Sequence, residues 1–291
     1  MSPSRRRLAL LLSLTPGIGG KSLVRILARL DLLGIGPEEF VRLSAASLVE
    51  EFGLKPKAAE ALAGRLPQLE SYTEEVEKRL DEHGVTLVTA ADASYPERLE
   101  AFDSNPPPAL FHYGNAKLLR TKTFCVLSSR RTSIAGLGQI EKLAEAGVLE
   151  GETLICGHDR PEFQRAAVVP LRWGAPRVIC LDRGLFQALG EDLSQEPFRA
   201  ARLWRYKFDP STDLAISPCR PETGFVGLNN QVRDRLIASL SDRLDFVEVN
   251  LGGNMEKLAR QGLKAGRKVR VSDRSVGYRE LMSVGAERID A

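Results

Sequence analysis

The stretch from Leu228 to Val271 constrains the fold most, because it holds a helix, a strand, a glycine turn, a second helix and a second strand in succession. Apolar residues recur at helical spacing over 231–240, and 244–249 is a short apolar run rich in β-branched and aromatic residues. A Gly-Gly turn then leads into a second helical pattern at 255–265, which ends at a glycine before the next strand. This order predicts a βαβ unit of a parallel sheet.

The Gly-Gly turn of this unit is a candidate anion site. Unpaired backbone N–H groups converge where a strand runs through a glycine turn into a helix, and the helix dipole favours negative charge there. Gly252, Gly253 and Asn254 would donate from this turn. The expected ligand is a phosphate group.

Several motifs in this stretch and before it resemble the DprA/Smf family. They are, in chain order, Tyr95-Pro96, the prolines at 106–108, Ser129-Arg130, the helical segment 233–242, Gly252-Gly253 and the segment 265–269. Members of this family are Rossmann-like proteins that bind single-stranded DNA and hand it to the recombinase RecA during natural transformation. The resemblance covers roughly residues 85–291, without the winged-helix extension that some members carry.

The resemblance implies an α/β fold: a Rossmann-like, doubly wound and mostly parallel sheet at residues 83–291, after a small helical domain at residues 1–82. Helical patterns at 8–14 and 22–30 flank a glycine turn at 16–20. This start resembles a helix-hairpin-helix, whose backbone N–H groups contact a DNA phosphate without reading sequence. A plain pair of packed helices explains the same pattern equally well.

The first core strand, at 123–127, is followed by Ser129 and Arg130. The family has an arginine on a DNA phosphate at this place, which Arg130 matches, and a doubly wound sheet binds ligands at the carboxyl ends of its strands. A solvated surface arginine is the alternative. In the next family loop only Gly157 and Asp159 of the family motif remain, so part of the phosphate loop is missing.

The resemblance extends to basic side chains of the central stretch. Arg233 would pair with phosphate, and Lys264 and Arg267 would add positive charge around the pocket. Arg233 and Arg235 lie about 200° apart around their helix, so both cannot face one pocket. The complete expected DNA-binding set is Ser129, Arg130, Gly157, Arg233, Gly252, Gly253, Asn254, Lys264 and Arg267.

The composition is that of an ordinary globular protein, with 43% hydrophobic and 27% charged residues. The net charge of +3 is too small to indicate nucleic-acid binding without local clustering. The four cysteines lie far apart with no metal-ligand spacing, so we expect reduced cysteines, a cytoplasmic protein, and neither a metal nor a cofactor. The apolar run at 8–14 is too short to span a membrane, which requires about 20 residues.

A second basic segment, at 198–208, alternates arginine and lysine with Trp204, Tyr206 and Phe208. Aromatic side chains can stack on bases while the cations neutralise phosphates. As a strand, however, the segment would turn its aromatic residues into the core and its charges outward. We favour the strand interpretation.

The expected function is therefore binding of single-stranded DNA with little base preference and without catalysis, in a homodimer whose partner is a RecA-type recombinase. Two alternatives stay open. The first is an enzyme of the lysine-decarboxylase-like phosphoribohydrolase group, which cleaves nucleoside monophosphates and for which Glu256 is the only candidate carboxylate. The second is a scaffold that keeps a protein interface and has lost DNA binding.

Overall fold

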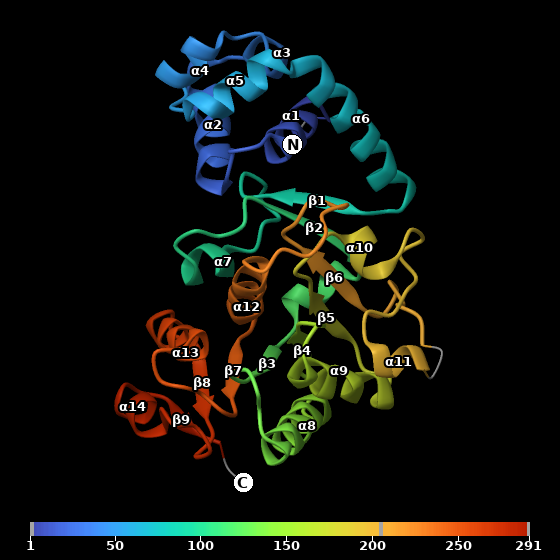
Figure 1. Ribbon diagram of the computed structural model, residues 1–291, viewed down its shortest axis with the longest axis vertical. Helices are drawn as coiled ribbons and strands as arrows, with labels where there is room; N and C mark the ends of the chain where they lie inside the picture. The colour runs from blue at the N-terminus through green and yellow to red at the C-terminus, as the bar shows by residue number, and fades with distance from the viewer. Residues whose placement is uncertain (1–2, 204–205, 290–291) are drawn as a thin grey trace. The chain divides into compact units, whose positions relative to one another are not determined.

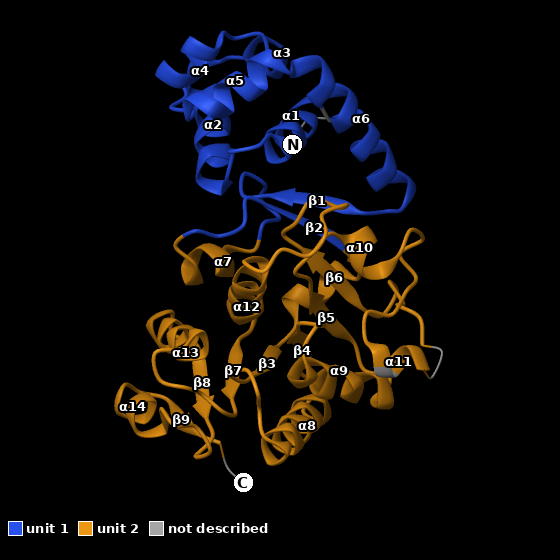
Figure 2. Ribbon diagram, in the orientation of Figure 1, with its two compact units in different colours: residues 1–95, 105–112 blue, residues 96–104, 113–291 orange. Residues whose placement is uncertain are grey.

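The computed structural model describes residues 3–203 and 206–289, and its contacts divide the chain into two compact units (Figure 1, Figure 2). Unit 1 comprises Met1–Tyr95 and Asn105–His112, and unit 2 comprises Pro96–Ser104 and Tyr113–Ala291. The chain thus enters unit 2, returns to unit 1 for one short segment and then completes unit 2. Unit 1 contains the predicted helical residues and extends beyond them.

Unit 1 consists mainly of helices around an apolar core. They are α1 (Pro3–Leu14), α2 (Gly20–Leu33), α3 (Pro37–Phe40), α4 (Ala45–Glu50), α5 (Pro56–Gly64) and α6 (Leu66–Glu82). Within the core, the rings of Phe40 and Phe52 meet edge-on with their centroids 4.9 Å apart. Residues 37–52 form two helices, because Ser44 accepts a hydrogen bond from the Ser47 N–H and so caps a new helix, α4.

The glycine turn between α1 and α2 is explained by close packing inside unit 1. Gly17 has a φ of +85°, a conformation that side chains other than glycine rarely adopt. A Cβ on Gly20 would lie 2.9 Å from the carbonyl oxygen of Pro106, which belongs to the returning segment of the same unit. These contacts favour a packed pair of helices over a DNA-binding hairpin.

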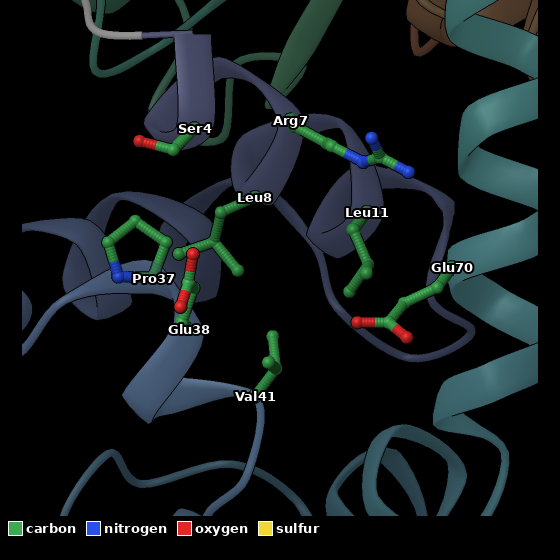
Figure 3. A pocket seen from close by; sticks show the side chains of 8 residues that line it. All are labelled: Ser4, Arg7, Leu8, Leu11, Pro37, Glu38, Val41 and Glu70. Carbon is green, nitrogen blue, oxygen red and sulfur yellow. The ribbon is translucent and has the colours of Figure 1, made fainter.

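Unit 1 also contains a groove of about 250 Å³ formed by residues of α1, α6 and the α3 region (Figure 3). It is lined by Ser4, Arg7, Leu8, Leu11, Pro37, Glu38, Val41 and Glu70. Leu8 and Leu11 are buried, whereas Glu38 and Glu70 are exposed. The groove therefore combines an apolar floor with an acidic rim.

An antiparallel pair of strands follows the helices of unit 1. β1 (Thr86–Thr89) pairs with β2 (Ala109–Gly114), so that Thr86 lies opposite His112. β2 begins in unit 1, and its last two residues belong to unit 2.

Unit 2 is built on a parallel sheet. Its strands are β3 (Thr123–Leu127), β4 (Thr153–Cys156), β5 (Arg177–Cys180), β6 (Leu214–Ser217), β7 (Arg243–Phe246), β8 (Lys268–Val271) and β9 (Glu287–Arg288). They lie in the order β6-β5-β4-β3-β7-β8-β9, and neighbours pair in parallel. The order reverses between β3 and β7, which defines a doubly wound sheet. The predicted fold class is confirmed.

Helices of unit 2 cover the sheet. They are α7 (Glu97–Phe102), the 3₁₀ helix η1 (Ala116–Arg120), α8 (Ile134–Leu149), α9 (Pro161–Trp173), α10 (Leu185–Leu189), α11 (Arg199–Leu203), α12 (Asn229–Leu240), α13 (Asn254–Lys264) and α14 (Tyr278–Ser283). α8 packs against α9, and α12 packs against α7 and α13 (Figure 1). Within the described ranges, no helix has the length and apolar character needed to cross a membrane.

The segment at 198–208 differs from the predicted strand. Residues 199–203 form helix α11, and Trp204 and Arg205 lie outside the described residues. Tyr206 is 41% exposed whereas Phe208 is 3% exposed, so these two aromatic side chains do not share one environment. The expected strand is not formed: the segment begins as a helix, and among the described residues after it only Lys207 makes a β-bridge, with Gln195.

Candidate nucleic-acid interface

The sheet of unit 2 has its topological switch point between β3 and β7 (Figure 1). Connections leave these neighbouring strands in opposite directions, so a crevice forms at their carboxyl ends. A pocket of about 360 Å³ lies there, with walls from the segment after β3, the starts of α9 and α12, and the turn before α13. The lining residues are Ser129, Arg130, Arg160, Asn230, Gln231, Asp234, Asn250, Gly253, Asn254 and Met255.

Four of the predicted residues meet in this pocket, namely Ser129, Arg130, Gly253 and Asn254. Ser129 joins the two strand ends, because its N–H donates to the Glu248 carbonyl at 2.7 Å and its Oγ accepts from the Asn250 N–H at 3.0 Å. Arg130 is exposed, and its side chain has no hydrogen-bond or ion-pair partner among the described residues. It is therefore available to an anionic ligand.

Two carboxylates of the chain occupy helix starts beside the pocket. Glu248 accepts hydrogen bonds from the Ser133 N–H and hydroxyl at the start of α8. Glu256 accepts from the Gly252 N–H at 2.6 Å and from Arg260 at 2.8 Å, which lowers the pKa of Glu256. Carboxylates are stabilised at these positions for the same reason as phosphates.

Two of the backbone donors predicted at the Gly-Gly turn are therefore already used. The Gly252 N–H donates to Glu256, and the Gly253 N–H donates to the Asn250 carbonyl at 3.2 Å. The expected role of Gly252 and Gly253 as phosphate donors is corrected: their N–H groups stabilise the turn. Asn254 donates from Nδ2 to Asp234 at 3.3 Å, with its side chain in the pocket wall.

Arg233 has a structural role and not the predicted role on phosphate. Its side chain is fully buried, and its guanidinium forms ion pairs with Asp159, with Asp182 at 3.0 Å and with Asp234 at 2.9 Å. Burial alone would lower the pKa of Arg233, but the charges of Asp234 and Asp159 raise it. The three carboxylates neutralise the charge of Arg233, and its side chain does not line the pocket.

Asp182 connects this cluster to His158. The Nε2 atom of His158 lies 3.2 Å from Asp182 Oδ1, and both side chains are buried. Burial alone would raise the pKa of Asp182, but His158, Arg183 and Arg233 together hold it well below its ordinary value. The carboxylate is thus kept ionised inside the protein.

Gly157 lies beneath Arg233 and does not line the pocket. A Cβ at this position would lie 2.7 Å from the Phe163 ring and 3.1 Å from Arg233 Cδ. The predicted DNA contact of Gly157 is corrected, because a glycine is required here for the packing of these two side chains. Asp159, the other residue that the shortened loop retains, is a partner of Arg233.

Lys264 and Arg267 lie away from the pocket. Helix α13 starts at Asn254 in the pocket wall and ends at Lys264, which is about 15 Å along the helix axis. Arg267 precedes β8 at the opposite edge of the sheet, where it donates to the Ser239 carbonyl at 3.4 Å. Neither side chain adds positive charge at the pocket, so both predictions are corrected.

Comparison with known proteins agrees with the predicted kinship. The family model of DNA recombination-mediator protein A matches residues 86–161, which include β3, Arg130 and β4. The X-ray structure of DNA processing protein A (DprA) from Streptococcus pneumoniae is similar over 99% of this chain and 95% of that chain, with a TM-score of 0.73 and 18% identity. The partial family match and the shared fold agree with the predicted resemblance to the DprA/Smf family.

A second solved structure supports the same fold. DNA processing protein A from Helicobacter pylori, described for its mode of binding single-stranded DNA, is similar over 71% of this chain and 91% of that chain, with a TM-score of 0.55 and 18% identity. No curated protein sequence matches the chain. The family-model match ends before 228–271, so for that stretch the likeness is one of fold alone.

Further arginines, not expected from the sequence, follow the ends of other strands of this sheet, and one of them, Arg160, lines the pocket together with Arg130. Arg130, Arg183, Arg220 and Arg274 stand three residues after the ends of β3, β5, β6 and β8, and Arg160 stands four residues after β4. Parallel strands end at one edge of a sheet, so the five arginines lie along the carboxyl edge of unit 2. The signal in the sequence is an arginine at nearly constant distance from each strand end.

Two of these arginines, Arg130 and Arg160, line the pocket, and Arg160 is the more buried of the two. Its guanidinium lies 4.8 Å from the centroid of the Phe163 ring, and its Nη2 lies 3.6 Å from Asp234 Oδ1. Its Nε is buried without a hydrogen-bond partner in the described part of the chain, and so is Oδ1 of Asn230. Such buried polar atoms are normally paired, and here both belong to residues of the pocket wall.

Proposed function

We propose that this DprA/Smf relative binds single-stranded DNA along the carboxyl edge of unit 2, protects the incoming strand and loads a RecA-type recombinase onto it. The observation that carries the proposal is Arg130, an exposed arginine beside the switch-point pocket without a partner among the described residues. Arginine suits phosphate because its planar fork can donate two parallel hydrogen bonds. The described ligand of the Helicobacter pylori protein motivates the choice of single-stranded DNA.

The row of arginines favours a polymer over a single nucleotide. Neighbouring strands lie about 4.8 Å apart, so the row from Arg220 after β6 to Arg274 after β8 spans about 24 Å. A mononucleotide would contact only one or two of these side chains. A strand that follows the edge can bring several phosphates to them.

Fluorescence anisotropy with labelled single-stranded and duplex oligonucleotides of equal length tests the proposal. Single strands should bind more tightly, and log affinity should fall with log salt at a slope of about −0.7 per phosphate neutralised. Tighter binding to duplex, or affinity independent of salt, would contradict a phosphate-binding edge.

We also propose that the protein acts in the cytoplasm as a homodimer during natural transformation and recombination. The support is its relationship to the DprA/Smf proteins. Light scattering over a range of protein concentrations measures the oligomeric state. Co-sedimentation on single-stranded DNA measures whether the protein increases the amount of bound RecA-type recombinase; a strictly monomeric protein with no such increase would contradict this part.

Catalysis is not part of the proposal. Glu256, the candidate carboxylate of the hydrolase alternative, is engaged by the Gly252 N–H and Arg260. Incubation with nucleoside monophosphates should therefore release no free base. Release that disappears in Glu256→Gln would establish the enzyme, and a folded protein with no affinity for single strands would support the scaffold alternative.

A further inference from the structure

The groove of unit 1 is built on one face of α1. Ser4, Arg7, Leu8 and Leu11 follow one another at spacings of three, one and three, which places them on the same side of the helix. Leu8 and Leu11 form an apolar floor together with Val41, which is only half-buried. The stretch of α1 that lines the groove is about 10 Å long, or about two helical turns. The floor therefore has the length to hold two turns of another helix.

Carboxylates flank this floor. Figure 3 shows Leu8, Val41 and Leu11 between the carboxylates of Glu38 and Glu70. Both glutamates are exposed, and neither has an ion pair or a side-chain hydrogen bond within residues 3–203 and 206–289. The start of helix α3 favours an acidic residue at Glu38, but Glu70 lies beyond the first turn of α6. Stabilisation of helix ends does not explain the acidic rim as a whole.

The acidic character extends along both sides of the groove. A second hollow, of about 460 Å³, shares Ser4, Pro37 and Glu38 with the groove and adds Gly36, Glu39 and Arg42. On the other side, Glu70, Glu74 and Glu77 lie on one face of α6 at spacings of four and three. Arg7 pairs with Glu74 at 3.3 Å and with Glu77 at 3.9 Å, so its charge is already balanced. The lining of both hollows is therefore negatively charged in sum, whereas the whole chain has a net charge of +3.

This combination disfavours a nucleic acid and favours a basic segment of a protein. The carboxylates of Glu38, Glu39 and Glu70 would repel phosphates. Lysine and arginine side chains on both sides of an apolar ridge would instead meet the acidic rim, while the ridge covers the floor. Grooves between helices commonly bind amphipathic helices in this way, through apolar side chains spaced three or four residues apart.

We propose that the groove of unit 1 docks a basic amphipathic helix of a partner protein. The bound helix contributes two turns, with apolar side chains against Leu8, Leu11 and Val41 and with cations near Glu38 and Glu70. The inference goes beyond the proposed binding of single-stranded DNA and does not depend on it. Unit 1 then serves as the protein-binding unit, separate from the DNA-binding edge of unit 2.

Three labelled peptides of about four helical turns each test the docking site by fluorescence anisotropy with the full-length protein. The first consists of leucine and lysine, with the leucines three or four residues apart. The second has the same composition with the leucines rearranged so that they share no helical face, and the third has glutamate in place of lysine. The first peptide should bind at least about tenfold more tightly than the second, and the third should not bind. Added salt should weaken binding of the first peptide, because the rim charges are exposed.

Variants of the groove locate the binding. Glu38→Lys combined with Glu70→Lys should weaken binding of the first peptide by about tenfold or more and reduce its salt dependence. Val41→Ser should weaken binding a few-fold and leave the salt dependence unchanged, because it removes only apolar contact. Glu51→Lys combined with Glu60→Lys is the matched control, since both are exposed glutamates of unit 1 outside the two hollows. This control should bind like the unsubstituted protein.

Three results would overturn the proposal. The first is equal binding of the ordered and the rearranged peptide, and the second is binding that survives the double variant of Glu38 and Glu70. The third is no peptide binding together with self-association of the protein that the same double variant abolishes, which would assign the groove to a second copy of the chain. Thermal unfolding checks that each variant is folded, and the exposed positions 38 and 70 decide the test should Val41→Ser unfold.

Discussion

The groove of unit 1 and the switch-point pocket of unit 2 differ in charge and in how many of their polar groups have hydrogen-bond partners. The groove of unit 1 has an apolar floor and an acidic rim, and its one arginine, Arg7, pairs with Glu74 at 3.3 Å and Glu77 at 3.9 Å. The pocket of unit 2 has Arg130 without a partner among the described residues and two buried polar atoms unpaired. An arginine and polar atoms without partners, and not the volume of the cavity, therefore distinguish the site suited to DNA.

The largest expected effect is a loss of stability when a buried charge is removed from unit 2. Removing an exposed charge from unit 1 serves as the comparison. Arg233→Ala should destabilise the protein by about 3–5 kcal/mol, because three carboxylates would lose a buried counter-charge. Arg7→Ala should cost less than about 1 kcal/mol, since its pairs are partly exposed. Chemical denaturation of both variants measures the contrast; equal effects would mean that the Arg233 cluster is not a structural element.

Acidification, in contrast, should destabilise unit 1 before unit 2. Burial lowers the pKa of His112, in unit 1, to about 4 from the ordinary 6.5, and its Nε2 has no partner in the described part of the chain. The unfolded state therefore binds more protons between these values, so the contribution is complete above pH 6.5 and is lost as the pH falls towards 4. The loss amounts to about 3 kcal/mol.

Denaturation at pH 7 and at pH 4.5 measures this loss, and His112→Phe should reduce it. Asp182 of unit 2 behaves differently, because its pKa is depressed. Its contribution to stability is present at every pH above the ordinary carboxyl pKa and is lost only as the pH falls below that value. A stability that is independent of pH between 7 and 4.5 would show that His112 is not held neutral by burial.

The next effect concerns DNA affinity and compares two exposed arginines. Arg130→Ala should weaken single-strand binding about tenfold, because a charge-assisted hydrogen bond contributes roughly 1.5–3 kcal/mol. Arg42, an exposed arginine of unit 1, provides the matched control, and Arg42→Ala should leave the affinity unchanged. If Arg42→Ala weakens binding and Arg130→Ala does not, the DNA site belongs to unit 1. Anisotropy at one fixed salt concentration decides between them.

The smallest expected effect is a gain of affinity. Glu256→Gln removes a negative charge beside the pocket and loosens its hold on the Gly252 N–H, so a phosphate can approach the start of α13. Charges at helix ends contribute about 0.3–1 kcal/mol, so affinity should rise roughly twofold to fivefold. Glu38→Gln, on the rim of the groove in unit 1, should have no effect. Weaker binding in Glu256→Gln would indicate that the carboxylate orders the turn for DNA.

Arg130 and Arg233 show how far the site was predictable. Both follow family motifs in the sequence, yet one is exposed and the other is fully buried among three carboxylates. Nothing local distinguishes them, because burial depends on side chains that are distant in sequence. Asp159 and Asp182, which neutralise Arg233, come from loops after β4 and β5.

The sequence by itself determined the order and type of the core elements, because apolar runs and helical spacing are local patterns and the glycine turn is a local signal. It also carried the resemblance to the DprA/Smf family and the place of Arg130 at a strand end. Only the tertiary structure decided which side chains share the pocket: strand order places β3 between β4 and β7, and so brings Arg160, after β4, and Asn230, before β7, to Arg130. Hydrogen-bond satisfaction is likewise a property of the assembled fold, and for that reason the Gly-Gly turn, a plausible phosphate site in sequence, is occupied by Glu256.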